Sequence, residues 1–205
     1  MIVIINCGLG NLGSIVNMLR KIGEEAIVSS NISDIKNADK LILPGVGTFD
    51  NGIKNIDKLQ LRSILDDKVI KDKTPILGIC LGMQLMTKKS EEGKLSGLGW
   101  IDATTIKFTF NKNSSDLKIP HMGWNNVVIQ KQSCLTADLP ENARFYFVHS
   151  YHLRCNDQQD ILTQTHYGYN FPSMIQKENI FGTQFHPEKS HKFGMKLLKN
   201  FIELC

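Results

Sequence analysis

The chain has 205 residues, of which 41% are hydrophobic and 21% are charged, and its formal net charge is +4. These proportions are close to globular norms and exclude a disordered chain, a collagen-like repeat and a coiled coil. The 24 lysines and arginines are scattered along the chain, so no nucleic-acid-binding stripe is indicated. No apolar run approaches the roughly 20 residues that cross a bilayer, so we expect no membrane span.

The N-terminal segment Met1–Asn6 lacks the basic region and the long apolar stretch of a secretion signal, so we do not expect it to be one. We predict that it is the first strand. The five cysteines are odd in number, and none is spaced as Cys-x-x-Cys. This pattern predicts neither a disulfide framework nor a thiolate zinc site. We therefore expect free thiols, no metal and a reducing cytoplasmic location.

In the first half of the chain, short apolar runs alternate with helical patterns. The predicted elements are a strand at 2–5, a helix from Leu12 to Ile22, strands at 26–28 and 41–43, a helix at 55–69, a strand at 75–79 and a helical segment near 83–85. Strands that alternate with helices at this spacing indicate βαβ units and a parallel sheet.

The second half of the chain changes character. Short strands are predicted at 106–108, 127–129, 145–148, 161–166, 173–176 and 180–184, followed by a last helix at 192–204. Their connections contain Pro, Gly, Asn and Asp, which favours antiparallel or mixed pairing. With no linker or repeat in the sequence, we predict one α/β domain over residues 1–205.

The segment Gly8–Gly13 matches G-x-G-x-x-G between a predicted strand and a predicted helix, which is the context of a dinucleotide site. That fingerprint also requires an acidic residue at the end of the second strand, to hold the ribose. Here the second strand ends in Val28-Ser-Ser-Asn31, without an acid. A tight glycine turn is the preferred interpretation, and a dinucleotide-binding α/β protein remains the non-enzyme alternative.

The segment Gly78–Gly82 is the cysteine form of the nucleophile elbow G-x-S-x-G, between a strand and a helix. Glycines flank the nucleophile because the turn is sharp. Cys80 would sit at a helix N-terminus, where the helix dipole favours the thiolate. By itself, the pattern fits a buried structural cysteine equally well.

A partner base favours the catalytic interpretation of Cys80. His186 ends a predicted strand, Pro187 stops further strand pairing, and Glu188 is close enough in sequence to contact the imidazole. The three residue types match the nucleophile, base and orienting residue of a triad.

The Pro44–Gly47 turn follows a buried strand that should lie beside the strand at 75–79. Its backbone can present the N–H of Val46 to a developing oxyanion, and the N–H of Leu81 would be the second donor. An ordinary Pro-Gly turn is the alternative.

Taken together and in this order, these motifs resemble the class I, or triad, glutamine amidotransferases. The matching segments are Gly10–Leu12, Pro44–Phe49, Gly78–Leu85, Ser90–Glu92, Pro120–Asn125, Tyr146–Tyr151 and Gln184–Ser190. The Pro-His-Met-Gly-Trp-Asn segment is the most specific of them. It resembles the branch formed by the glutaminase subunits of imidazole glycerol phosphate synthases.

The resemblance implies a three-layer αβα sandwich with a mostly parallel central sheet. It implies Cys80 as nucleophile, His186 as general base and then acid, and Glu188 as the orienting residue. Positions that hold the substrate glutamine match Gln84, Glu92, Ser150 and Tyr151. Positions at or near a partner match Asn11, Trp124, Asn125, Tyr146 and Lys189.

The resemblance also implies a heterodimer with a (βα)8-barrel synthase, which uses the released ammonia to make imidazole glycerol phosphate in histidine biosynthesis. No cofactor is expected. The first helix and the segment His191–Met195 also look like a branch found with surface-polysaccharide enzymes, in which ammonia goes to a sugar amidination. The acceptor therefore stays open. A cysteine peptidase on the same scaffold and a non-catalytic subunit are further alternatives.

Overall fold

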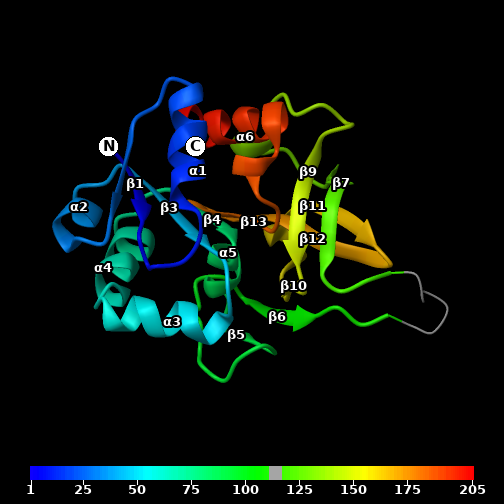
Figure 1. Ribbon diagram of the computed structural model, residues 1–205, viewed down its shortest axis with the longest axis horizontal. Helices are drawn as coiled ribbons and strands as arrows, with labels where there is room; N and C mark the ends of the chain where they lie inside the picture. The colour runs from blue at the N-terminus through cyan, green and yellow to red at the C-terminus, as the bar shows by residue number, and fades with distance from the viewer. Residues whose placement is uncertain (111–116) are drawn as a thin grey trace.

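The computed structural model describes residues 1–110 and 117–205. Its centre is an eight-stranded sheet in the order β2-β1-β3-β4-β13-β12-β11-β8 (Figure 1). The strands from β2 to β13 are parallel, and β12, β11 and β8 continue the sheet in antiparallel pairing. These strands are β1 (Ile2–Ile5), β2 (Ala26–Ser29), β3 (Lys40–Gly45), β4 (Ile76–Cys80), β8 (Val128–Ile129), β11 (Ile161–Tyr167), β12 (Tyr169–Lys177) and β13 (Ile180–Thr183).

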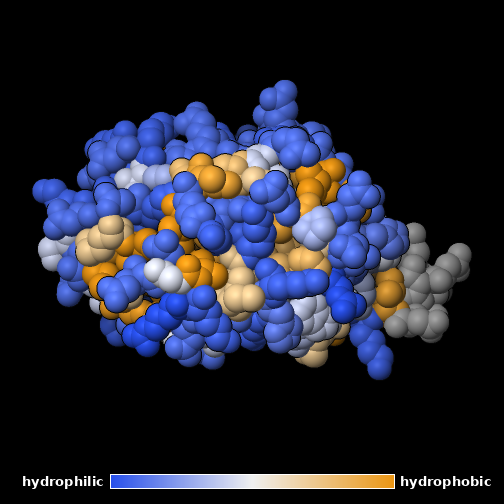
Figure 2. All heavy atoms as spheres, turned by 90° about the horizontal axis from the view of Figure 1, so that it is seen from above, coloured by the Kyte–Doolittle hydropathy of each residue, from blue (hydrophilic) through white to orange (hydrophobic). Residues whose placement is uncertain are grey.

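Helices cover both faces of this sheet, which makes the three-layer αβα sandwich that the family resemblance implies (Figure 1). On one side, α1 (Leu12–Lys21) and α6 (His191–Glu203) pack their apolar faces on alternate residues of the strands. On the other side lie α2 (Ile32–Lys36), α3 (Phe49–Lys58) and α4 (Arg62–Asp66). The short helix α5 (Leu81–Leu85) follows β4 directly. Seen from above, polar residues cover most of the visible face, with apolar patches between them (Figure 2).

Two small sheets are added beside the antiparallel end of the main sheet. One has the order β10-β6-β5 and the other pairs β7 with β9. Their strands are β5 (Lys89–Ser90), β6 (Ala103–Lys107), β7 (His121–Asn126), β9 (Arg144–His149) and β10 (Tyr151–Cys155). The antiparallel or mixed character predicted for the second half is confirmed, although the sequence patterns did not reveal β5, β7 and β10.

The single helix predicted over 55–69 is wrong. Helix α3 begins earlier, at Phe49, and ends at Lys58, and the chain then turns through Gln60, whose φ of 56° is outside the helical region. Helix α4 and a π-helical segment, Asp67–Lys71, follow the turn. The apolar periodicity continues across this break because Ile56, Leu61 and Leu65 are all buried against the same side of the sheet.

The expectation of five free thiols is also wrong, because Cys134 and Cys205 form a disulfide across a sequence separation of 71. Helix α6 brings the C-terminus to the 3-10 turn Cys134–Thr136. The side chain of Asn200 secures this contact by donating hydrogen bonds to the carbonyls of Leu135 and Ala137. Across the residues that the structure describes, no helix is long and apolar enough to cross a membrane.

Candidate active site

Cys80 occupies a strained turn between β4 and α5. Its backbone has φ 55° and ψ −110°, a conformation that L-residues rarely adopt. The flanking glycines are required: a Cβ on Gly82 would lie 1.7 Å from the carbonyl oxygen of Leu43, and one on Gly78 would lie 2.7 Å from the amide of Met83. The sequence thus builds the sharp elbow that the motif predicts.

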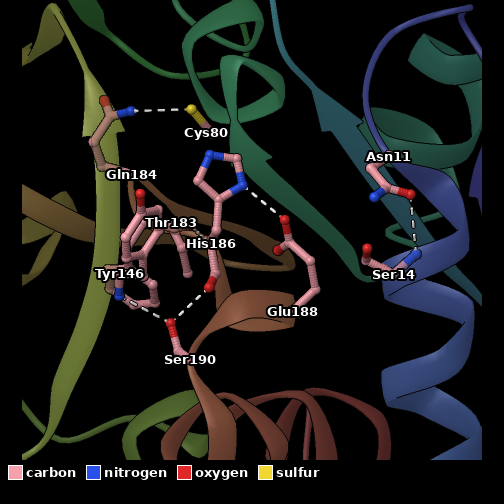
Figure 3. Close-up of polar contacts among 10 residues, drawn as sticks. Asn11, Ser14, Cys80, Tyr146, Thr183, Gln184, His186, Glu188 and Ser190 are labelled. Carbon is pink, nitrogen blue, oxygen red and sulfur yellow. Dashed lines mark hydrogen bonds and ion pairs between the residues drawn. The ribbon is translucent and has the colours of Figure 1, made fainter. Parts of the chain in front are cut away.

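His186 and Glu188 meet Cys80 at the same sheet edge, because β13 pairs in parallel with β4. The Nδ1 of His186 donates to Oε1 of Glu188 over 2.7 Å, and both side chains are buried. The imidazole lies between the thiol of Cys80 and the carboxylate (Figure 3). Ser190 fixes the backbone here, since its hydroxyl donates to the carbonyl of His186 over 2.6 Å.

The surroundings of His186 favour its protonated form. Burial by itself lowers the pKa of the imidazole, but hydrogen bonding and charge from Cys80 and Glu188 outweigh burial and raise the pKa to about 10. Within the described part of the chain, Nε2 has no partner at ordinary hydrogen-bond geometry. This nitrogen is the one that faces Cys80, so it is free for proton exchange at the sulfur (Figure 3).

A cavity of about 340 Å³ opens beside the thiol. Besides Cys80 and His186, it is lined by residues that the sequence analysis selected, namely Val46, Leu81, Gln84, Glu92, Ser150 and Tyr151. They come from the ends of β3 and β4, from α5, from the segment after β5 and from the junction of β9 and β10. The fold thus gathers every predicted oxyanion-hole and glutamine-pocket residue around one cavity.

Backbone contacts hold the acidic side of the cavity. Oε2 of Glu92 accepts a hydrogen bond from the amide of Phe49 over 2.8 Å, at the start of α3. The amide of Glu92 in turn donates to the hydroxyl of Ser90 over 3.1 Å. A carboxylate fixed in this way can bind the α-ammonium of an amino-acid substrate.

The amide of Gln84 is already occupied. Its Nε2 donates to the carbonyl of Tyr151 over 3.1 Å and to Oε1 of Gln184 over 3.0 Å. The sequence analysis missed Gln184 as a candidate, although its amide lies 3.7 Å from the sulfur of Cys80. Its position two residues before His186 was the available signal.

The other free thiols are poorly placed for chemistry. Burial raises the pKa of Cys7 to about 12, and burial together with the nearby carboxylates of Asp160 and Asp157 raises the pKa of Cys155 to about 12. Both thiols therefore stay protonated and unreactive at neutral pH.

Three residues predicted to face a partner, Trp124, Tyr146 and Lys189, lie in an aromatic and basic group that also includes Arg144 on β9 and His191 at the start of α6. Trp124 pairs with Tyr146 across β7 and β9 and remains 43% exposed. Its ring stacks on His191 at 5.5 Å, and the guanidinium of Arg144 lies 5.8 Å from its centre. The ammonium of Lys189 lies 5.8 Å from the ring of Tyr146.

The two predicted interface asparagines have roles inside the chain. Oδ1 of Asn11 caps α1 by accepting from the amide of Ser14 over 3.3 Å (Figure 3). Asn125 uses both amide hydrogens within the chain, facing His121 Nε2 at 3.2 Å and donating to the carbonyl of His166 over 3.0 Å.

The Gly8–Gly13 segment forms a tight turn in which Gly8 and Gly10 have φ of 70° and 96°. A Cβ on Gly10 would lie 3.8 Å from the amide of Val46, so the turn lies beside the loop after β3 without crowding it. The positive φ angles of Gly8 and Gly10 account for these two glycines and favour the tight-turn interpretation.

Comparisons with known proteins agree with this geometry. The sequence model of the family "Glutamine amidotransferase class-I" matches residues 3–204. The chain belongs to the class I glutamine amidotransferases. It is therefore an enzyme of the amidotransferase type, and the resemblance drawn from its motifs is confirmed.

Two similar relatives are each named "Imidazole glycerol phosphate synthase subunit HisH 2". The relative from Methanococcus maripaludis is 56% identical over 203 residues, covering 99% of both chains, and the one from Pseudomonas aeruginosa is 47% identical over 204 residues, covering 100% of both. The solved structure of PurLQS from Thermotoga maritima superposes with a TM-score of 0.74 at 15% identity, covering 98% of this chain and 96% of that one. This structural likeness supports the fold.

Proposed function

We propose that this amidotransferase is the glutaminase subunit of an imidazole glycerol phosphate synthase. It hydrolyses glutamine to glutamate and ammonia and delivers the ammonia to a (βα)8-barrel partner in a cytoplasmic heterodimer that serves histidine biosynthesis. The observation that carries the proposal is the buried Cys80, His186 and Glu188 arrangement beside the cavity. The full-length relatives named as synthase subunits support the choice of acceptor.

The reaction follows from the positions of the three side chains. His186 takes the proton of Cys80, and the thiolate sulfur attacks the amide carbon of glutamine to form a C–S bond. The C–N bond then breaks as His186 returns the proton to the leaving nitrogen, which departs as ammonia. Water then attacks the γ-glutamyl thioester with His186 as base, and the C–S bond breaks. Glutamate is released, and the thiol of Cys80 is regenerated. Glu188 stabilises the imidazolium throughout.

Binding and charge stabilisation are assigned to the cavity walls. The amides of Val46 and Leu81 would hold the oxyanion that develops on the substrate carbonyl. Glu92 would pair with the substrate ammonium, and Gln84 has only its oxygen left for substrate, because both of its amide hydrogens are used internally. Ser150 and Tyr151 would complete the wall.

Ammonia must reach an acceptor without entering bulk water, where it protonates at neutral pH. The group formed by Trp124, Tyr146, Lys189, His191 and Arg144 is our candidate for part of the partner face. Aromatic side chains and arginine are enriched in protein interfaces.

The test uses glutamine labelled with ¹⁵N in its amide, supplied to the chain together with its co-purified barrel protein and the barrel's acceptor. We expect the label in imidazole glycerol phosphate and no transfer with Cys80→Ala. Label in an amidinated sugar instead would establish the surface-polysaccharide alternative. Hydrolysis that continues in Cys80→Ala would overturn the assigned nucleophile.

A further inference from the structure

A continuous series of hydrogen bonds links the sulfur of Cys80 to Asn125, which lies on β7 in a different sheet. We propose that Gln184 is a positioning residue for Cys80, held in orientation by a hydrogen-bond network that ends in the buried imidazoles of His149 and His121. This inference deepens the proposed function and rests on it, because it concerns how the assigned nucleophile is oriented.

The first link is the side chain of Gln184, which is fully buried between the nucleophile and the glutamine pocket. Its Oε1 accepts from Gln84 Nε2 over 3.0 Å, so its amide nitrogen must point the other way, toward Cys80 Sγ at 3.7 Å. Cys80 therefore lies between the amide of Gln184 and the ring of His186 (Figure 3). A donor in this place stabilises the thiolate and limits where the sulfur can lie.

The second link is the main-chain carbonyl of Tyr151. It accepts from Gln84 Nε2 over 3.1 Å and from His149 Nδ1 over 2.7 Å. The carbonyl is thus shared between the glutamine pocket and the histidine pair. The other amide hydrogen of Gln84 is donated to Gln184. The orientation of the side-chain amides of Gln84 and Gln184 therefore depends on the position of the Tyr151 carbonyl.

The third link is the contact between His149 Nε2 and His121 Nδ1, which are 3.0 Å apart. Burial lowers the pKa of His149 well below its usual value and lowers the pKa of His121 to about 4, so both rings are neutral at pH 7. A neutral ring has one donor and one acceptor nitrogen. Since His149 Nδ1 donates to a carbonyl, its Nε2 accepts, and His121 Nδ1 is the donor.

The far end of the network confirms the same proton positions independently. His121 Nε2 must then accept, and the group facing it at 3.2 Å is the amide nitrogen of Asn125. That nitrogen also donates to the carbonyl of His166 over 3.0 Å, which fixes the amide orientation without reference to the histidines. Two carbonyls, one at each end of the histidine pair, therefore select one arrangement of all the protons.

The donor role of Gln184 is tested with two variants. Gln184→Glu keeps the acceptor for Gln84 and replaces the donor with an oxygen, and Gln184→Met removes both. The measurements are the rate at which iodoacetamide alkylates Cys80, followed by peptide mass spectrometry, and the kcat and KM for glutamine hydrolysis. Losing a hydrogen bond to a charged group predicts about a 10- to 100-fold fall in alkylation rate and kcat, with KM changed less.

Gln130→Glu is the matched control, because it makes the same exchange at an exposed residue just after the edge strand β8 and should leave both rates unchanged. Unchanged rates in Gln184→Glu would overturn the donor role even if Gln184→Met were impaired, because the glutamine would then serve only as the acceptor for Gln84. Loss of glutamine hydrolysis in Cys80→Ala would still support the proposed function, whatever the Gln184 variants show. Failure of the Gln184 role can therefore be distinguished from failure of the proposed function.

Coupling through the network is tested with a double-mutant cycle, since spatial continuity alone does not demonstrate coupling. His121→Phe removes the donor to His149 and should lower the alkylation rate about two- to tenfold, while His121→Asn, which can still donate from a nitrogen near the same place, should restore much of it. In the Gln184→Glu background, His121→Phe should add little further loss. Fully additive losses would show that His121 acts only through general stability.

Discussion

At the scale of single residues, the reactivity of the cysteines is set by their surroundings. Cys80 faces the cavity and an imidazole, whereas Cys7 and Cys155 are held protonated by burial, and Cys134 is tied to Cys205. The five cysteines thus comprise one candidate nucleophile, two unreactive thiols and one disulfide-bonded pair.

The first prediction concerns the nucleophile. Cys80→Ala should abolish glutamine hydrolysis, because removing a triad nucleophile typically costs a factor on the order of 10⁴ or more. The fold should persist, since the substitution removes one atom at a turn. A glutamine-like electrophile should label Cys80 alone in the native chain, as read by peptide mass spectrometry. Labelling at Cys7 or Cys155, with hydrolysis intact in Cys80→Ala, would contradict the assignment.

The second prediction concerns Glu188, whose carboxylate contacts the imidazole. Glu188→Gln removes a charge that raises the pKa of His186, so the imidazolium needed to protonate the leaving amine becomes less stable. Turnover should fall by a factor on the order of 10³–10⁴, less than for Cys80→Ala, because orienting residues contribute less than the nucleophile. Steady-state kinetics should show kcat changing far more than KM. A rise in KM with kcat unchanged would indicate that Glu188 binds substrate.

Residues of the triad could be found from the sequence because each sits in a short motif that fixes its local geometry. The network around Gln184, His149 and His121 could not, because its members are far apart in the chain and each alone fits a buried strand position. Only the pairing of β7 with β9, which places His121 opposite His149, brings the imidazoles together. Long-range register of this kind leaves no periodic signal in one sequence.

At the scale of elements, the site depends on turns that follow parallel strands. Strand β3 ends at Gly45, which is opposite Cys80 in register, and the turn that follows has Gly47 at φ 115°. Glycine on both sides of Val46 lets its peptide rotate at little steric cost. One orientation would complete the oxyanion hole and the other would break it, which suits a turn that a partner can control.

The third prediction tests this turn. Gly47→Ala meets open space, with its nearest contact at 4.0 Å, but an alanine strains the positive φ by about 1–2 kcal/mol. The substitution should shift the Val46 peptide and lower kcat by up to about 10²–10³, the cost of one oxyanion donor. Gly23→Ala is the matched control, since Gly23 also has positive φ, of 88°, with nothing near its Cβ. Equal kcat in the two variants would refute the oxyanion role of this turn.

Strands buried on both faces were predictable as elements because they read as continuous apolar runs. The helix over 55–69 was mispredicted because burial continues through a turn at Gln60, and periodicity records burial rather than hydrogen bonding. Strands β7 and β10 were missed for the opposite reason. Their sequences, His121–Asn126 and Tyr151–Cys155, mix polar with apolar residues and so do not read as apolar runs, although Leu153 and Cys155 are buried in the core.

At the scale of the whole molecule, the disulfide ties the C-terminus to the middle of the chain. In the chain-entropy view, a crosslink across 71 residues stabilises the folded state by about 4 kcal/mol. Cysteine spacing could not predict this pair, because only the packing of α6 against the 3-10 turn Cys134–Thr136 brings the two residues together. In a reducing compartment, Cys134 and Cys205 would lie side by side as free thiols, and the folded state would lack the stabilisation that the disulfide provides.

The last prediction separates stability from assembly by comparing the two tryptophans. Trp100 is 4% exposed and donates to Asp66, whereas Trp124 is 43% exposed on β7. Trp100→Ala should lower the free energy of unfolding by about 3–5 kcal/mol, the usual cost for a buried aromatic residue. Trp124→Ala should melt near the unsubstituted chain, because its ring is half-exposed and lies against His191, Arg144 and Tyr146 at the surface.

The same variant should reveal the partner face. An isolated glutaminase that ran freely would waste glutamine, so the bare chain should hydrolyse it slowly and the barrel protein with its acceptor should accelerate it. In Trp124→Ala that acceleration should be lost while the slow basal rate persists, because the cavity residues are untouched. Calorimetry of both tryptophan variants, with hydrolysis assayed with and without the barrel, makes the measurement. If Trp124→Ala instead melts as early as Trp100→Ala, the residue supports the fold, and the partner face must lie elsewhere.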